Sequence, residues 1–152
     1  MQHEVLGEIT RDGSEDEGSA KVQYGDRVVE IQILAEDETF EDCVELAASA
    51  VRRLQTLDVA AKRVVAADLT EVYNGGWNEY DEPQEDGSVK TVAHPELSED
   101  ELAAKLTLDE LHVRDTALDF FYDNQDLFWG HTVMVCSRNG TDLADASAEL
   151  FG

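Results

Sequence analysis

The sequence predicts an α+β domain, built on a mostly antiparallel sheet of about six to seven strands with helices packed on one face. Two observations lead to this fold class. Strand-like and helix-like segments are segregated along the chain, as three strands, two longer helices, a loop with a short helix, and four further strands. Within the strand-like segments apolar and polar residues alternate, which is typical of a sheet with one buried and one solvated face. The 152 residues correspond to one domain, 1–152.

Three strands are expected before the first helix. Residues 4–10 form the first candidate strand, and residues 21–24 and 27–34 form a hairpin around Gly25 and Asp26. In the second arm of this hairpin Val29, Ile31 and Ile33 alternate with polar side chains. This arm should therefore direct its branched apolar residues into the core.

Two longer helices are expected next. Thr39 is a good N-cap residue, and the apolar residues that follow it recur at helical spacing up to Leu54. Asp58 is expected to cap a second helix, with Val64, Val65, Leu69 and Val72 as its inner stripe. The pair Gly75–Gly76 should end this second helix.

The remaining chain divides into a loop, a short helix and four strands. Residues 78–96, which follow Trp77, combine many acidic residues with prolines and a glycine and are expected to form a mobile surface loop. A capping box at Ser98 and Glu101 starts the short helix. The four strands are then expected at 108–114, 117–122, 127–136 and 144–151.

The charge balance is the most unusual feature of the composition. Asp and Glu number 35 against 11 for Lys and Arg, which gives a formal net charge of −24. Such a field repels nucleic acids and anionic membrane surfaces, so neither is expected as a partner. Three explanations of the acidity remain open: solubility, adaptation to high salt, or a basic protein partner.

The cysteines and the N-terminus predict a cytoplasmic protein. Cys43 and Cys136 show no metal-type or redox-motif spacing, and buried free thiols are the default in a reducing compartment. The first residues show neither the basic nor the apolar stretch of a secretory signal, and no apolar run approaches the length of a membrane span.

The segment 119–135 is the most distinctive in the chain. It joins an acidic turn at 123–126 to an apolar run that is expected to be a central strand, covered on both faces, with a bulge at Gly130. The sequence Asp-Leu-Phe-Trp-Gly-His at 126–131 resembles an uncharacterised bacterial domain-of-unknown-function family, family 2262. The resemblance implies a fold and supplies no reaction. It also implies, by association with bacterial toxin-immunity proteins, a binding role.

No catalytic residue, metal site or cofactor is predicted. His131 could act as a base or ligand with Asp119, Asp123, Asp126 or His112, but a structural histidine is the commoner case. Glu110 and His112 share a strand face and could be half of a metal pair, but nothing gathers a third ligand by spacing. The sequence also lacks the glycine and serine motifs of phosphate binding and nucleophilic catalysis.

Binding residues are predicted where acidic residues meet aromatic ones. They are Trp77, Tyr80, Asp123, Asp126, Trp129 and His131. Aromatic residues among carboxylates suit a basic partner, so the leading hypothesis is a non-enzymatic acidic domain, of immunity type or otherwise, that binds a basic protein. Two alternatives stay open. One is a small-ligand-binding or hydrolytic domain with a pocket near His131 and Trp129, and the other is an acidity that reflects only salt adaptation or solubility.

Overall fold

The computed structural model describes residues 1–152 and contains three α-helices, one π-helical turn and eleven strands. The elements are, in chain order, β1 (Gln2–His3), β2 (Gly7–Glu8), β3 (Thr10–Arg11), β4 (Glu17–Tyr24), β5 (Arg27–Leu34), α1 (Phe40–Arg52), α2 (Leu54–Val72), the π-helical turn η1 (Tyr73–Trp77), β6 (Glu79–Pro83), β7 (Val89–Ala93), α3 (Glu99–Ala104), β8 (Thr107–Arg114), β9 (Ala117–Asp123), β10 (Thr132–Ser137) and β11 (Ser147–Phe151). The predicted α+β class is confirmed. None of the helices has the length and apolar composition that crossing a lipid bilayer requires.

One seven-stranded sheet organises the molecule, in the order β11-β10-β9-β8-β5-β4-β3. Every neighbouring pair is antiparallel except β5 and β8, which run parallel because the helices connect them. Two small separate pairs, β1-β2 and β6-β7, complete the strand set. The sheet is therefore mixed but mostly antiparallel, as the sequence predicts.

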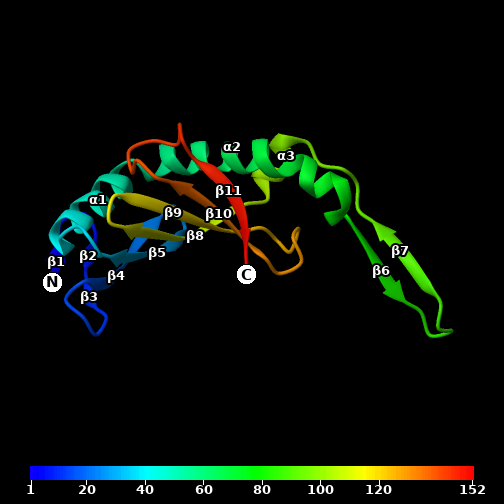
Figure 1. Cartoon of the computed structure of the whole chain (residues 1–152), viewed down its shortest axis with the longest axis horizontal. Helices are drawn as coiled ribbons and strands as arrows, with labels where there is room; N and C mark the ends of the chain where they lie inside the picture. The colour runs from blue at the N-terminus through cyan, green and yellow to red at the C-terminus, as the bar shows by residue number, and fades with distance from the viewer.

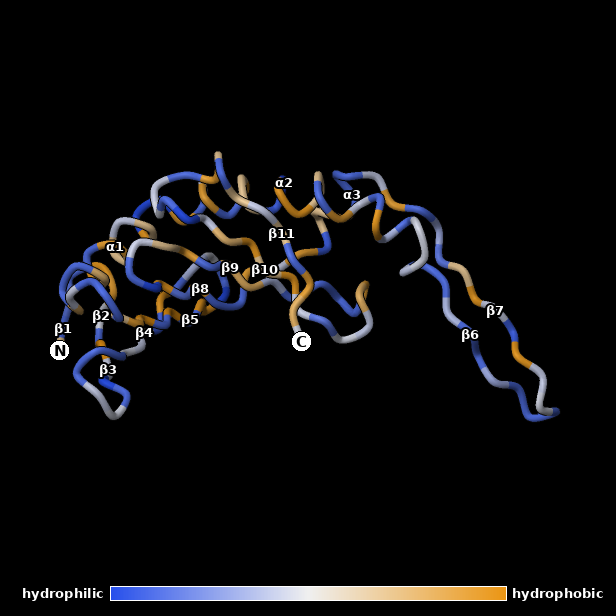
Figure 2. The backbone as a smooth tube through the Cα atoms, in the orientation of Figure 1, coloured by the Kyte–Doolittle hydropathy of each residue, from blue (hydrophilic) through white to orange (hydrophobic).

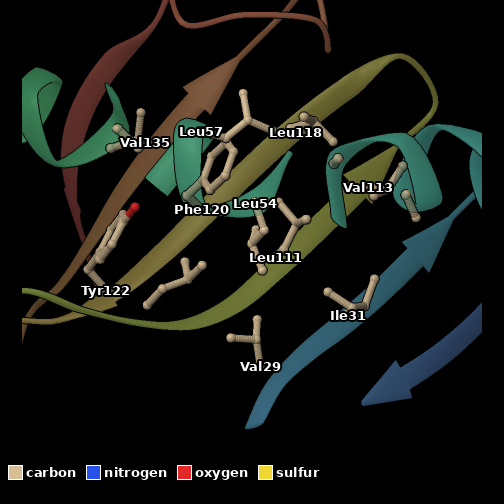
Figure 3. Packing of buried hydrophobic residues seen from close by; sticks show 14 of the residues in the cluster. Val29, Ile31, Leu54, Leu57, Leu111, Val113, Leu118, Phe120, Tyr122 and Val135 are labelled. Carbon is tan, nitrogen blue, oxygen red and sulfur yellow. The ribbon is translucent and has the colours of Figure 1, made fainter. Parts of the chain in front are cut away.

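The helices lie along one side of the sheet (Figure 1). Helix α1 packs on β5 and β8, and helix α2 packs on β10 and β11. The buried face presents alternate strand residues such as Val29, Leu111 and Phe120 to helix residues such as Leu54 and Leu57 (Figure 3). No helix covers the other face of the sheet, which is called the open face below.

The N-caps of α1 and α3 form as the sequence predicts. The Thr39 hydroxyl accepts a hydrogen bond of 3.1 Å from the Asp42 N–H at the start of α1. Ser98 and Glu101 form a reciprocal capping box at the start of α3. These signals are local in sequence, and local hydrogen bonds suffice to fix both helix starts.

The predicted start of the second helix was wrong. Helix α2 begins at Leu54, after a single non-helical residue, Arg53, and Asp58 lies buried inside it. Asp58 is held in the core by the hydroxyls of Tyr24 and Tyr122, which donate hydrogen bonds of 2.8 and 2.7 Å to its carboxylate. The predicted inner stripe is also wrong at one position, because Val72 is exposed.

Residues 78–96 contain a hairpin where an irregular loop was expected. Strands β6 and β7 pair antiparallel from Glu79 with Ala93 to Pro83 with Val89. The hairpin extends away from the body of the molecule, beyond the end of α2 (Figure 1). Its tube is mostly hydrophilic, with apolar stretches on β7 (Figure 2). Nearly all of its strand residues are exposed.

The predicted strand at 127–136 starts later than expected, at Thr132. The residues before it form a turn in which Gln125, Asp126, Trp129 and Gly130 all have positive φ. A left-handed backbone cannot continue a strand ladder, so the apolar run is divided between turn and strand. The resulting β10 lies between β9 and β11 but is covered by helices on one face only, not on both as predicted.

Candidate functional site

A buried asparagine shapes the turn that precedes β10. The Asn124 side-chain amide donates a hydrogen bond of 2.7 Å to the backbone carbonyl of His131. Its carbonyl oxygen accepts one of 3.4 Å from the N–H of Phe128. Asn124 is 3% exposed and thus ties both ends of the turn together inside the protein. Sequence reasoning missed this residue, and its only signal was its place in an Asp-Asn-Gln-Asp turn.

The turn inserts Phe128 into the core and leaves Trp129 at the surface. Phe128 is fully buried, whereas Trp129 is 56% exposed with φ of 52°. The left-handed conformation is disfavoured for a large side chain, by about 1–2 kcal/mol. Strain of this kind at an exposed aromatic residue is a feature of binding and active sites.

Trp77 joins this turn to the end of α2. It belongs to the π-helical turn η1, and its ring centroid lies 4.8 Å from that of Trp129 and 5.5 Å from that of His131. Phe128 contacts the same indole edge-on, with centroids 5.6 Å apart. The structure thus brings together three of the predicted site residues, Trp77, Trp129 and His131, from segments about fifty positions apart. Trp77 also packs partly against the core.

A hollow of about 550 Å³ lies between Trp129 and the hairpin base. This hollow is called the hairpin hollow below. Six residues line it: Gly76, Glu79, Tyr80, Asp81, Thr91 and Trp129. Tyr80 is 42% exposed and lies beside His94, with ring centroids 5.8 Å apart. The hollow therefore combines two aromatic side chains with two carboxylates, the chemistry that recognises organic cations.

The other predicted site residues lie around this hollow or away from it. Asp126 is in the same turn as Trp129, whose N–H donates to the Asp126 carbonyl at 3.2 Å. His131 contacts Trp77 but does not line the hollow, and its ring makes no hydrogen bond in the structure. Asp123 ends β9 close to Asp109, where burial of Asp109, together with the Asp123 charge, raises the pKa of the Asp109 carboxyl. Asp123 is therefore not grouped with the aromatic residues.

The two thiols are poorly placed for nucleophilic chemistry. Burial, together with the adjacent Asp119 carboxylate, raises the pKa of Cys136 to about 11. Burial and the nearby Asp115 carboxylate also raise the pKa of Cys43. A thiolate is the reactive form, so both side chains are protonated and weakly nucleophilic near neutral pH.

The Glu110–His112 pair forms as the strand spacing predicts. The two side chains lie on the open face with 2.9 Å between Glu110 Oε2 and His112 Nε2. No group of three or more His, Cys, Asp or Glu side chains is close enough to hold a metal ion. The pair is therefore a hydrogen-bonded pair on the sheet surface.

Comparison with known proteins places the chain in a family without assigning a reaction. No curated protein and no solved structure matches it significantly. Residues 3–148 match the model of a family described as an uncharacterized protein conserved in bacteria. The match spans both long helices, the hairpin and the sheet up to the start of β11, and it agrees with the resemblance carried by residues 126–131. The chain is thus a member of the uncharacterised bacterial family DUF2262.

Proposed function

We propose that this domain is a non-enzymatic binding protein that engages a basic protein partner through the hairpin hollow. The observation that carries the proposal is the position of Trp129. Its indole is held out of the core, contacts the Trp77 ring at a tilt of 52°, and faces a hollow that also contains Glu79 and Asp81. Exposed tryptophan and tyrosine side chains are the residues that most often dominate binding energy in protein interfaces.

The chemistry of the hollow selects for a cationic group. A Lys or Arg side chain placed over an indole gains roughly 0.5–2 kcal/mol from the ring quadrupole. The carboxylates of Glu79 and Asp81, which line the same hollow, add charge-assisted hydrogen bonds. The partner therefore presents at least one exposed basic side chain to Trp129.

The projecting hairpin supports the proposal that the partner is a macromolecule. A two-stranded ribbon by itself is marginally stable in water, and β6-β7 pairs with no other strand. Its strand residues are exposed on both faces. A partner that covers the ribbon would supply the burial that the free domain lacks.

The overall charge supports the same partner class. At a net charge of −24 the domain repels nucleic acids and anionic membranes and attracts basic proteins at long range. In one form of this proposal the domain acts as an immunity-type inhibitor and masks a cationic enzyme. The two free cysteines support a cytoplasmic location for the encounter.

A pull-down from lysate of the domain's own host tests the proposal. We expect the wild-type domain to retain a basic protein at low ionic strength and to release it at high ionic strength, because screening shortens the reach of the charges. Trp129→Asn should abolish retention. Phe151→Asn is the matched control, since it removes an equally exposed aromatic side chain that does not line the hairpin hollow.

A second pair of variants tests the carboxylates. Glu79→Gln with Asp81→Asn should weaken retention, whereas Glu15→Gln with Asp16→Asn removes the same charge from a loop at the opposite end of the molecule (Figure 1) and should not. Equal losses in both double variants would mean that only net charge matters. Retention that survives Trp129→Asn, or that ignores salt, would refute the proposed site.

A further inference from the structure

The open face of the sheet carries a hollow that the proposed function does not use. It has a volume of about 660 Å³ and lies over strands β8, β9, β10 and β11. A second hollow of about 360 Å³ adjoins it and shares Glu110, His112 and Arg114. The larger volume, called the open-face hollow below, falls within the range of small-molecule sites.

Apolar and aromatic side chains line one part of the open-face hollow. They are Phe121 on β9, Met134 on β10 and Phe151 on β11. Phe121 lies 4.3 Å from the His112 ring and meets Phe151 edge-on at 6.3 Å, both measured between ring centroids. Phe151 is 59% exposed, so an aromatic wall stands open to solvent. Such a wall packs well against a flat ring.

The charges around the open-face hollow are closer to balance than those of the whole chain. Three carboxylates face it, and two of them pair with an arginine, Asp119 with Arg114 at 2.7 Å and Asp109 with Arg27 at 3.0 Å. The third, Glu110, lies 2.9 Å from the Nε2 atom of His112. In a chain with 35 acidic and 11 basic residues, two arginines for three carboxylates is a local exception. The balance favours a ligand without net charge over an ion of either sign.

Asp119 fixes the position of Arg114. It is 4% exposed, and its Oδ2 atom accepts a hydrogen bond from the Nε of Arg114. Its Oδ1 atom is also buried and has no hydrogen-bond partner, and the Asp119 carboxylate lies beside the Cys136 thiol. Asp119 is thus a positioning residue, which leaves the two terminal amino groups of Arg114 without a partner in the protein.

Arg114 and Glu110 form the polar rim of the open-face hollow and therefore offer hydrogen-bond donors and acceptors together. The Arg114 guanidinium is half-exposed and provides N–H donors in a fixed plane. The Glu110 carboxylate uses only Oε2 in its pair with His112, and its Oε1 atom remains available as an acceptor. A planar group with one acceptor and one donor complements this rim.

We propose that the open-face hollow binds a flat, uncharged molecule whose edge carries both a hydrogen-bond acceptor and a donor, as an aromatic carboxamide does. Arg114 donates to the ligand carbonyl, Glu110 accepts from the ligand N–H, and the ring packs against Phe121 and Phe151. This site is separate from the hairpin hollow and goes beyond the proposed protein binding.

Three matched probes test the ligand class. Benzamide, benzamidine and benzoate share a ring and differ in the charge of the polar group. In an NMR titration of the full chain, we expect benzamide to shift backbone amides of β8 to β11 with a dissociation constant on the order of 1 mM. Stronger binding of benzamidine or benzoate at these amides, or no benzamide shifts there, would overturn the proposal.

Variants that keep the fold locate the site. Arg114→Lys retains a charge for Asp119 but removes the planar fork, and Phe151→Ala removes an exposed ring. Each should weaken benzamide binding about tenfold. Arg63→Lys and Val59→Ala on the exposed surface of α2 are the controls, and Trp129→Asn should also leave benzamide binding unchanged. Wild-type affinity in Arg114→Lys and Phe151→Ala would refute the assignment.

Discussion

The hydroxyl of Tyr122 donates a hydrogen bond of 2.7 Å to the Oδ1 atom of Asp58 inside the core. Tyr24 donates to Oδ2 of the same carboxylate at 2.8 Å, and the Lys62 ammonium lies 3.5 Å from it. The Tyr122 ring lies among the labelled core residues, with its oxygen at one end (Figure 3). This group connects helix α2 to β4 and β9 and satisfies a charge that burial would otherwise destabilise.

Removal of one hydroxyl from this group should lower stability. Tyr122→Phe deletes a hydrogen bond to a buried carboxylate and should reduce the free energy of unfolding by about 1.5–3 kcal/mol. Denaturant unfolding measures the change. Tyr80→Phe serves as the control, because its hydroxyl makes no hydrogen bond and the residue is exposed. Equal stability of Tyr122→Phe and the wild type would mean that the bond contributes nothing net.

The same group predicts a sensitivity to alkaline pH. Burial and the Asp58 charge raise the pKa of Tyr122, and burial with the Asp58 hydrogen bond raises that of Tyr24 to about 12. An unfolded tyrosine titrates near pH 10, so the folded state favours the protonated phenols. The stability contributed by this shift is present in full below about pH 10 and is lost as pH rises through about 12.

Absorbance titration checks this alkaline behaviour. We expect tyrosinate absorbance to appear at higher pH in the folded protein than in the urea-unfolded chain. Tyr24→Phe should remove the component that titrates near pH 12. Coincident titration curves for the folded and unfolded protein would contradict the predicted shift.

Asp115 organises the segment between β5 and α1. Its Oδ1 atom accepts hydrogen bonds of 2.7, 3.0 and 3.1 Å from the three successive backbone N–H groups of residues 36–38. These bonds lower the pKa of the Asp115 carboxyl, although neighbouring residues are acidic. The resulting stability is present above the unfolded pKa, about 3.9, and is lost as pH falls through the lower folded value.

Asp115→Asn tests this arrangement. The amide tolerates the left-handed backbone, φ of 53°, and keeps one oxygen acceptor but loses the charge. We expect a lower melting temperature than that of the wild type at neutral pH. The difference should shrink as pH falls below about 4, because the carboxyl of the unfolded chain then takes up a proton before that of the folded protein does. If the difference in melting temperature between Asp115→Asn and the wild type does not change with pH, the effect comes from the altered side-chain geometry and not from the lost charge.

Salt dependence separates partner binding from salt adaptation as the origin of the acidity. Charge repulsion in a chain of −24 should be screened as the Debye length falls from about 30 Å at 0.01 M to about 10 Å at 0.1 M salt. We expect the melting temperature to rise over this interval and to change little between about 0.1 and 1 M. A continued rise into molar salt would favour adaptation to a saline host.

Local signals explain which parts of the fold could be predicted. The alternation at Val29, Ile31 and Ile33 and the caps at Thr39 and Ser98 depend on neighbours in sequence, and the structure confirms them. Asp58 was taken for a cap because its partners, Tyr24 and Tyr122, lie 34 and 64 residues away. No local pattern reveals such contacts.

The candidate site could be predicted only in part for the same reason. Aromatic residues among acids identified Trp77 and Trp129 as candidates, but their contact depends on how the end of α2 meets the turn before β10. That turn resembled a strand, because Phe128 and Trp129 extend an apolar run. The hydrogen bonds of Asn124, which divide the run, are visible only in three dimensions.

The strain at Trp129 leads to a final prediction. Asparagine adopts the left-handed backbone more readily, so Trp129→Asn relieves about 1 kcal/mol of strain while it loses an aromatic contact with Trp77 worth about 0.5–1.5 kcal/mol. The two effects offset each other, and the free energy of unfolding should change by less than about 1 kcal/mol. Denaturant unfolding measures this change, and the pull-down measures the loss of binding. A variant that remains stable but no longer binds shows that the protein maintains a strained, exposed tryptophan for its partner, whereas a large destabilisation would make Trp129 a structural residue.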